Sequence, residues 1–448
     1  MTSHPVSLTN PWVVSSFHHQ LFGTSLIWLA AIAFVILAVA IASRRIFSFN
    51  LSSAGLAEPR ARTYLRWAFG ALWLFDGILQ FQPSMPLGLG SVVVYPASQG
   101  TPGWLHHLML HGLTLWYEHP VALAVGVAWI QVGLGLALLT SNGAVGRVAG
   151  LVSAGWAALI WLIGNGAGGI FVRGASILFG WPGATLFYAA AGLWIAAPAE
   201  VFARRFSAVT LRAISAVLAI AVIFQSLPDA QFWHGGKSNA LNTMTSTMTA
   251  VPQPHWLAWM VRHGGDLGAV MGGGLNVAIV LWLAVTAWGM WIAATRPWRW
   301  PVVCLAVGAV VFWVVGEDTA VFGGVATDVN SLLPLSLLAV CASPAWRGAG
   351  ARERRLPREA GAGVGSVVAT FATAMVAFSV VSMGVAAASP AENSLFIAQN
   401  GPVSSADTPA PRFTLVDVDH QTYSLGEHPG RTTVVAFLDP VCWTDCPL

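Results

Sequence analysis

Charged residues are scarce in this chain of 448 residues. Asp, Glu, Lys and Arg make up 9% of it, whereas 56% of the residues are hydrophobic and 22 are Trp. Soluble domains carry about 25% charged residues, so this composition excludes a soluble globular protein and indicates a protein of the lipid bilayer. The formal net charge is +3. The few basic residues lie mainly in the connections between apolar runs, which membrane topology explains, so the charge gives no reason to expect nucleic-acid binding.

Long apolar runs recur along the chain. A helix needs about 20 apolar residues to cross a hydrocarbon core of about 30 Å, and about ten segments approach or exceed that length. They are residues 21–42, 65–81, 120–140, 146–164, 180–198, 210–226, 272–294, 300–316, 330–343 and 364–387. We therefore predict an all-α polytopic membrane protein with about ten transmembrane helices.

The chain lacks the basic n-region of a cleavable signal peptide before its first apolar run, so we expect the first helix to be retained. Basic residues occupy alternate connections between the apolar runs, namely Arg44, Arg45, Arg60, Arg62, Arg66, Arg147, Arg204, Arg205, Arg212, Arg296, Arg299 and the cluster from Arg347 to Arg358. The positive-inside rule makes these connections cytoplasmic and places both termini outside. We expect a multi-pass protein of the cell membrane with this orientation.

Two stretches of the chain repeat each other. The matching residues are Gln80 with Gln225, Pro83 with Pro228, Trp104 with Trp256, His111 with His263, and Gly164 with Gly316. The first matched residues are separated by fewer positions than the later ones, and a loop that is slightly longer in the second unit accounts for the difference. Each unit, residues 64–198 and 210–343, holds four predicted helices. An even number of helices makes the two copies parallel.

The first unit opens with Arg66-Trp-Ala-Phe-Gly-Ala-Leu-Trp-Leu-Phe-Asp-Gly-Ile-Leu79. The unit resembles the DoxX-like family of small membrane proteins over residues 64–198 and, more faintly, over 210–343. The resemblance implies four-helix membrane modules associated with quinone-linked sulfur or thiol oxidation, so quinone is an expected cofactor. It supplies no catalytic residues that carry over to this chain.

Asp76 lies within an apolar helix, where an ionisable group is costly and marks a candidate functional residue. Ala221 occupies the matching position in the second unit. Asp76 either bonds a neighbouring helix or serves a proton relay or a substrate, and its own helix offers no partner for the second role. We expect Glu317, Asp318 and Asp328 to be solvated acids of an outer loop.

The predicted topology places all twelve histidines at or beyond the outer face. His107 and His111 are four residues apart, so a helix would put both imidazoles on one face, as two ligands for copper or zinc. The matched pair His111 and His263 is the stronger candidate, and the loop from Met244 to Met248 adds soft Cu(I) ligands. The alternative is an amphipathic segment with its histidines at the headgroup level.

Cysteine is rare, with four residues in the chain. Cys304 and Cys341 lie within apolar helices without Cys-x-x-Cys spacing or a nearby cation, which indicates inert buried thiols. Cys442 and Cys446 instead follow a strand-like run, residues 432–438, in an outer segment where disulfide and Cu(I)–thiolate chemistry are both possible. At the first turn of a helix, three intervening residues would let both sulfurs reach one metal ion, and a structural disulfide is the alternative.

The C-terminal residues read as a short hairpin, Phe413–Asp417 with His420–Leu425, that leads into a buried strand. The segment from Pro411, with Cys442-Trp-Thr-Asp-Cys446-Pro447, resembles the start of Sco-type (SenC) redoxin domains. The resemblance implies that Cys442 and Cys446 bind copper for cytochrome oxidase assembly or exchange disulfides. A thioredoxin fold needs more strands and helices than follow Pro411, so we expect an incomplete thioredoxin-like α/β segment here.

The chain therefore divides into the outer N-terminus and first helix (1–63), the repeats (64–198 and 210–343), a tenth helix (363–387), an outer tether (388–411) and the redoxin-like start (412–448). The leading hypothesis is a membrane-anchored extracytoplasmic thiol-disulfide or Cu(I)-handling protein that serves a respiratory oxidase or another outer redox partner. If this protein is an enzyme, the expected activity is that of a thiol-disulfide oxidoreductase. The first alternative is a transporter or metal permease built on the duplicated bundle. Charged residues that line a pathway across both repeats would favour it. The second alternative is a quinone-linked electron donor to the outer dithiol.

Overall fold

The computed structural model describes residues 8, 11–43, 59–322, 325–344, 362–390, 414–416 and 421–424. The chain divides into two units, Thr9–Asn393 and Met1–Leu8 with Ser394–Leu448. The first unit holds every described helix, and the second holds a two-stranded hairpin.

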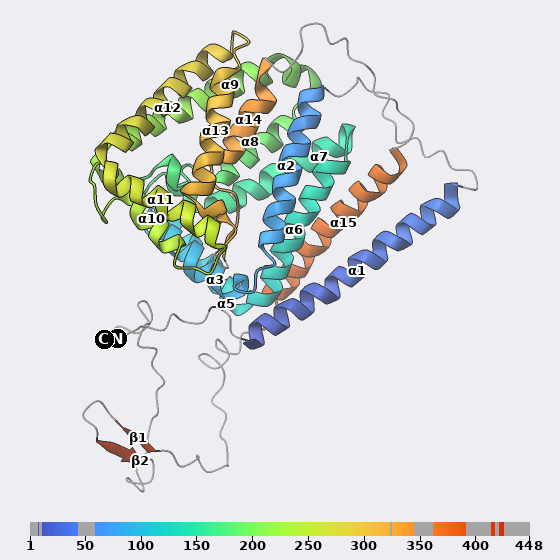
Figure 1. The fold of residues 1–448 in the computed structure, drawn as a ribbon. Helices are drawn as coiled ribbons and strands as arrows, with labels where there is room; N and C mark the ends of the chain where they lie inside the picture. The colour runs from blue at the N-terminus through green and yellow to red at the C-terminus, as the bar shows by residue number, and fades with distance from the viewer. Residues whose placement is uncertain are drawn as a thin grey trace. The chain divides into compact units, whose positions relative to one another are not determined.

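The N-terminal part of the helical unit consists of α1 and of a first half that runs from α2 to α8 (Figure 1). Its elements are α1 (Pro11–Ser43), α2 (Arg60–Leu79), α3 (Met85–Gly88), η1 (Leu89–Val94), α4 (Tyr95–Ser98), α5 (Gly103–Glu118), α6 (Pro120–Thr140), α7 (Gly143–Leu159), η2 (Ile160–Gly164), η3 (Gly166–Gly169), η4 (Ile177–Phe179) and α8 (Ala184–Ala196). The segments η1 and η2 are π-helical, and η3 and η4 are 3₁₀ turns.

The second half follows the same order. Its elements are α9 (Ala199–Ser226), η5 (Pro228–Ala230), α10 (Ala240–Met248), α11 (His255–Met271), α12 (Gly273–Ala293), α13 (Trp300–Val315), η6 (Asp318–Ala320) and α14 (Leu332–Ala342), and α15 (Ala362–Ala387) comes last. In each half a long helix comes first, and short helical pieces follow it. Next come two helices with a single residue between them, α5 and α6 in the first half and α11 and α12 in the second. The half ends with a pair of helices, α7 and α8 or α13 and α14, of which the second is short. The helix α9 begins before residue 210, the expected start of the second repeat.

Each of the ten predicted apolar runs overlaps a described helix. Six helical spans are long and apolar enough to cross a membrane, namely Val13–Val35, Pro120–Thr140, Gly143–Gly164, Ala199–Ser226, Gly273–Ala293 and Val368–Ala387. The chain is therefore a predominantly helical, multi-pass membrane protein. The helices α2, α8, α13 and α14 do not meet the same criterion, so their status as spans stays a prediction.

Glycine pairs bring the helices of the first half close together. A Cβ on Gly70 would lie 3.1 Å from the carbonyl oxygen of Gly135, where α2 crosses α6. A Cβ on Gly192 would lie 2.5 Å from the carbonyl oxygen of Gly150, where α7 crosses α8. Helices in a bilayer gain packing energy from such small-residue contacts, because lipid offers little hydrophobic driving force between them.

Equivalent hydrogen bonds close both halves. Arg62 Nη2 donates to the carbonyl of Ala197 at the end of α8, and Ser207 Oγ donates to the carbonyl of Ala342 at the end of α14. These bonds satisfy carbonyl groups that a helix terminus leaves unpaired. The first helix of each half is thereby tied to the end of its last helix.

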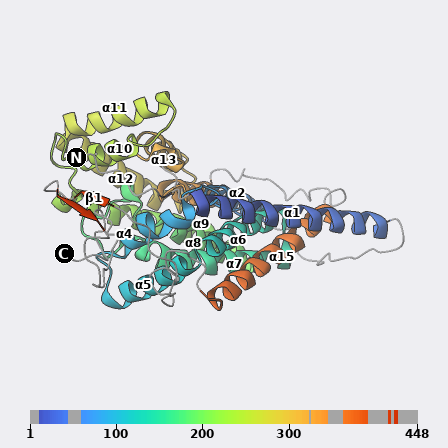
Figure 2. The same cartoon turned by 90° about the horizontal axis from the view of Figure 1, so that it is seen from below.

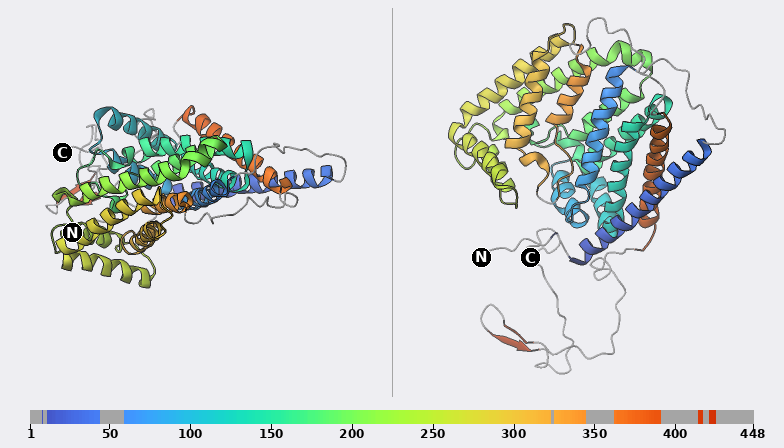
Figure 3. Two further views of the ribbon diagram at one scale, coloured as in Figure 1. Left: turned by 90° about the horizontal axis from the view of Figure 1, so that it is seen from above. Right: turned by 45° about the vertical axis from the view of Figure 1, so that its right-hand side comes forward.

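The helices α1 and α15 border the first half (Figures 1 and 3). Gly133 of α6 faces Val376 of α15, and the indole of Trp28 in α1 meets the ring of Phe371 edge-on at 5.4 Å. Both helices contact α6. The corresponding helix of the second half, α12, carries exposed apolar side chains such as Leu281 and Trp288.

The predicted C-terminal hairpin is confirmed. Strand β1 (Thr414–Val416) pairs antiparallel with β2 (Thr422–Ser424), with Leu415 opposite Tyr423. The predicted strand at 432–438, Cys442, Cys446 and most of the expected tether lie outside the described residues. A thioredoxin-like continuation therefore stays a prediction.

Candidate functional site

Each half ends in a helix that is too short to cross the bilayer without the backbone that precedes it. The helix α8 has 13 residues and α14 has 11, which at 1.5 Å per residue gives about 20 Å and about 17 Å. The hydrocarbon core is about 30 Å thick. Irregular backbone precedes both helices, and within a membrane such backbone is tolerated where it is buried in protein or lines a cavity.

That irregular backbone has the same unusual conformation in both halves. Consecutive residues have positive φ angles in each, namely Gly166 (54°), Ala167 (56°), Gly168 (64°) and Gly169 (73°) in the first half, and Asp318 (52°), Thr319 (58°) and Ala320 (50°) in the second. Residues other than glycine adopt this region at an energetic cost, and such strain gathers at functional sites. In the first half, Gly168 also packs directly against the carbonyl of Pro182, where a side chain has no room.

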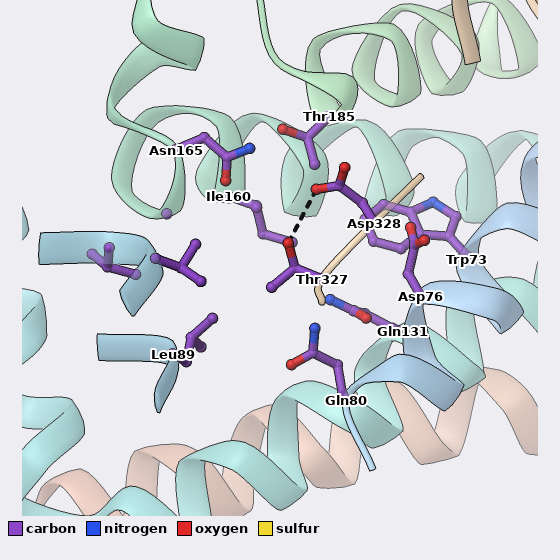
Figure 4. Close-up of a pocket in the computed structure, with 13 residues that line it drawn as sticks. Trp73, Asp76, Gln80, Leu89, Gln131, Ile160, Asn165, Thr185, Thr327 and Asp328 are labelled. Carbon is purple, nitrogen blue, oxygen red and sulfur yellow. Dashed lines mark hydrogen bonds between the residues drawn. The ribbon is translucent and has the colours of Figure 1, made fainter. Parts of the chain in front are cut away.

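A polar cavity of about 90 Å³ lies beside these segments. Figure 4 shows polar side chains from several elements gathered around it. Its lining consists of Trp73, Asp76 and Gln80 from the α2 region, Leu89, Val93 and Val94 from η1, Gln131 from α6, Ile160, Gly164 and Asn165 after α7, Thr185 from α8, and Thr327 and Asp328 from the loop before α14. The cavity is therefore built by the first half together with one loop of the second.

Several buried polar atoms at this cavity have no hydrogen-bond partner. They are Oδ1 of Asp76, Oε1 of Gln131 and Oγ1 of Thr185, and these side chains are 2%, 4% and 3% exposed. The hydroxyl of fully buried Tyr188 lies next to the Asp76 carboxyl group, within reach of a hydrogen bond to it. An unpaired buried polar group costs about 1–3 kcal/mol, so a set of them around one space indicates a place for a ligand or water.

The loop between α13 and α14 brings acidic groups to the first half. Glu317 accepts a hydrogen bond from Asn330 Nδ2, and Asp328 Oδ1 accepts one from the Asn330 backbone N–H at 2.8 Å. Burial and the neighbouring charge of Asp328 raise the pKa of Glu317 well above its usual value, and burial raises the pKa of Asp328 as well. Asp328 also lies close enough to Asp76 for their charges to repel.

The interpretation of these residues as solvated loop acids is therefore wrong. Glu317 and Asp318 are 2% and 4% exposed, and Asp328 lines the cavity. Sequence spacing gave no sign of this, because the loop is buried by contacts with the distant first half. Gln82 after α2 donates to the carbonyl of Val321, and Ser331 Oγ donates to the carbonyl of Gly180 at 2.5 Å.

In the second half, the amide side chains at the corresponding place are held in hydrogen bonds. Gln225 Oε1 accepts a hydrogen bond from Ser176 at 2.6 Å, and Gln225 Nε2 donates to Asn276 Oδ1 at 2.7 Å. Gln80, which matches Gln225 in the sequence, instead lines the cavity with Gln131. The same pair of helices thus carries a closed structural network in one half and an open polar site in the other.

The candidate histidines lie on two helices at the surface of the bundle. His107 and His111 are exposed on one side of α5, and His263 is exposed on α11, where its ring stacks near Trp259 at 4.1 Å. Figure 2 shows α5 and α11 on opposite sides of the bundle. The structure therefore brings His107 near His111 and keeps His111 away from His263. No group of three or more His, Cys, Asp or Glu residues suited to a metal occurs among the described residues.

The expectation of a bound quinone stays a prediction. A cavity of about 150 Å³ takes a benzene molecule, and the polar cavity is smaller, at about 90 Å³. A larger groove of about 620 Å³ runs along α12 and α13 beside Cys304, and its lining is almost entirely apolar. The indoles of Trp282 and Trp300 and the Cys304 thiol are the polar groups of that lining.

Comparisons give no relative of this chain: no protein-family model, no curated protein and no solved structure matches it. The resemblances to DoxX-like modules and to Sco-type redoxins therefore stay predictions. The geometry of the polar cavity is the basis for a functional conclusion.

Proposed function

We propose that the helical bundle is a cation permease, and that the cation passes through the polar cavity. The observation that carries this proposal is that both halves supply carboxyl groups to one buried site, Asp76 from α2 and Asp328 from the loop before α14. Ionisable groups inside a membrane bundle are costly and mark ion or proton pathways. Charged residues from both repeats along one pathway are the feature that the sequence analysis expects of a permease.

The position of the cavity supports the proposal. Transporters built from repeats bind their ions where helices are interrupted at corresponding places in the two halves. In this protein α8 and α14 are short helices at corresponding places, each preceded by a left-handed turn, at 166–168 and 318–320. Strained backbone at these points provides an element with more than one arrangement, which alternating access requires.

The charges define how the site would work. Two carboxylates at short range in a medium of low dielectric repel each other strongly, so Asp76 and Asp328 favour a state in which a cation or a proton is bound. Hydrogen bonds from Gln82 to Val321 and from Ser331 to Gly180 hold the loop that carries Asp328 against the first half. Release of that loop would open the site to one side of the membrane.

We also propose that the two halves are tandem parallel repeats, with ten spans in all and both termini outside. The common order of elements, the matched left-handed turns and the two closing hydrogen bonds support a duplication. The alternating basic connections support the orientation.

Ion flux tests the permease. The full chain is reconstituted in proteoliposomes, a gradient of Na⁺, K⁺ or H⁺ is imposed with the membrane potential clamped, and the cation current is recorded. We expect a current that Asp76→Asn reduces at least tenfold, while Asp266→Asn, on the exposed face of α11, leaves it unchanged. Absence of any protein-dependent current, or an unchanged current in Asp76→Asn, contradicts the proposal.

A second candidate function concerns the C-terminal segment. The β1–β2 hairpin lies where a redoxin-like domain is expected to begin, and this favours an outer module in which Cys442 and Cys446 exchange disulfides or bind Cu(I) for a respiratory oxidase. An anaerobic Cu(I) titration of the full chain tests it beside a Cys442→Ser/Cys446→Ser variant. Stoichiometric binding lost in the variant supports copper delivery, and equal binding by both proteins rules it out.

A further inference from the structure

We infer that the cavity binds an alkali-metal cation, Na⁺ or K⁺, through oxygen atoms of Asp76, Gln131 and Thr185 together with Asp328. This inference rests on the proposed cation transport and names the chemical class of the transported ion. It is carried by the donor set of the cavity and by the polar atoms that the protein leaves unpaired there.

The donor set excludes soft and borderline metals. The lining contains no His, Cys or Met side chain, and its polar groups apart from the Trp73 indole are carboxyl, amide and hydroxyl groups. Copper and zinc prefer nitrogen and sulfur ligands, whereas hard cations prefer oxygen. Calcium requires six to eight oxygens, commonly from several carboxylates, and the lining has two carboxyl groups, Asp76 and Asp328.

The charge balance favours a monovalent ion. The ionisable groups that face this region are Asp76, Asp328, Tyr188 and, behind Asp328, Glu317. Two carboxyl groups, Asp76 and Asp328, line the cavity, and they lie close enough for their charges to repel. A single positive charge leaves the buried site neutral when one of them is ionised, whereas a divalent cation would require both to be ionised against that repulsion.

The unpaired oxygens favour a metal ion over a proton alone. A proton on Asp76 satisfies one acceptor, whereas Gln131 Oε1 and Thr185 Oγ1 are also without partners. An alkali ion draws several oxygens together at once. The cavity of about 90 Å³ has room for such an ion with one or two waters, since a water occupies about 30 Å³ in the liquid.

Carbodiimide labelling of Asp76 tests the inference on the full chain in detergent, with the modified residue read by mass spectrometry. Labelling is compared in NaCl, in KCl and in choline chloride at equal ionic strength. We expect Na⁺ or K⁺ to suppress labelling at least tenfold and saturably, with a midpoint that moves to higher salt as the pH falls. Gln131→Leu should raise that midpoint about tenfold or more without changing labelling in choline chloride.

Labelling that falls with rising pH yet ignores Na⁺ and K⁺ overturns the inference, because the site then takes protons only. The permease proposal survives that result if a proton current is present. Suppression by Na⁺ without any current has the opposite meaning: the site binds the ion, and the transport proposal fails. Thermal unfolding in the same three salts provides a check without labelling, and a midpoint equal in all three overturns the inference.

Discussion

Substitution of Gly192 by alanine should destabilise the bundle where α8 crosses α7. The added Cβ would lie 2.5 Å from the carbonyl oxygen of Gly150 and 2.8 Å from the backbone nitrogen of Ala154. Both are backbone atoms of a helix that is packed along its length, so the two helices must move apart. Such overpacking costs about 1–3 kcal/mol.

The helix propensity of alanine offsets part of this cost. Alanine is favoured over glycine by about 1 kcal/mol in a helix interior, so the net loss for Gly192→Ala is at most about 2 kcal/mol. At about 2–4 °C per kcal/mol for a chain of a few hundred residues, the unfolding midpoint should fall by up to about 8 °C. Thermal unfolding of the purified protein in detergent measures the change.

Gly155→Ala is the matched control, because Gly155 lies on α7, is exposed, and has nothing within 4 Å of an added Cβ. It should be neutral or slightly stabilising. Because both substitutions gain the same helix propensity, Gly192→Ala should be about 1–3 kcal/mol less stable than Gly155→Ala, and equal stability of the two variants would refute the close crossing of α7 and α8. Equal destabilisation by both substitutions would show that the effect is unrelated to this contact.

Three further predictions concern buried polar groups. Burial raises the pKa of Asp318 from 3.8 to about 6, so the folded protein keeps this proton up to a higher pH than the unfolded chain does. The stability of the fold should therefore fall as the pH rises across that interval. Unfolding midpoints measured from pH 4 to 6 should depend less steeply on pH in Asp318→Asn than in the wild type. Gln225→Leu removes the partner of Ser176 and Asn276 and should cost about 2 kcal/mol or more in the same unfolding assay. Trp73→Phe loses one hydrogen bond to Ser153 and should cost about 1 kcal/mol; a larger loss than in Gln225→Leu would contradict this ranking.

The helices and the C-terminal hairpin could be predicted because their signals are local. Apolar runs of sufficient length give helices in a bilayer whatever their neighbours, and the alternating residues around Leu415 and Tyr423 pair across a short turn. The bounds of the short helix α8 were harder to predict, because the apolar run 180–198 begins with a turn and the helix covers only Ala184–Ala196.

The cavity could be predicted in part. Asp76 was identified from its apolar surroundings alone. Its neighbours were not, because Gln131, Thr185 and Asp328 come from separate elements and meet only through tertiary packing. Asp328 in particular belongs to a loop whose composition resembles that of a solvated connection, and the contacts that bury it lie far away in the sequence.

The direct test of the central claim is whether Asp76 and Asp328 act at one site. Cation current is measured for the wild type, Asp76→Asn, Asp328→Asn and the double variant, and the coupling is calculated as in a double-mutant cycle. Residues that share one ion should be strongly non-additive, with the double variant little worse than either single one and a coupling of about 1–3 kcal/mol. Effects that add within about 0.5 kcal/mol would show that the two carboxyl groups act independently, and would contradict a cation site built by both halves.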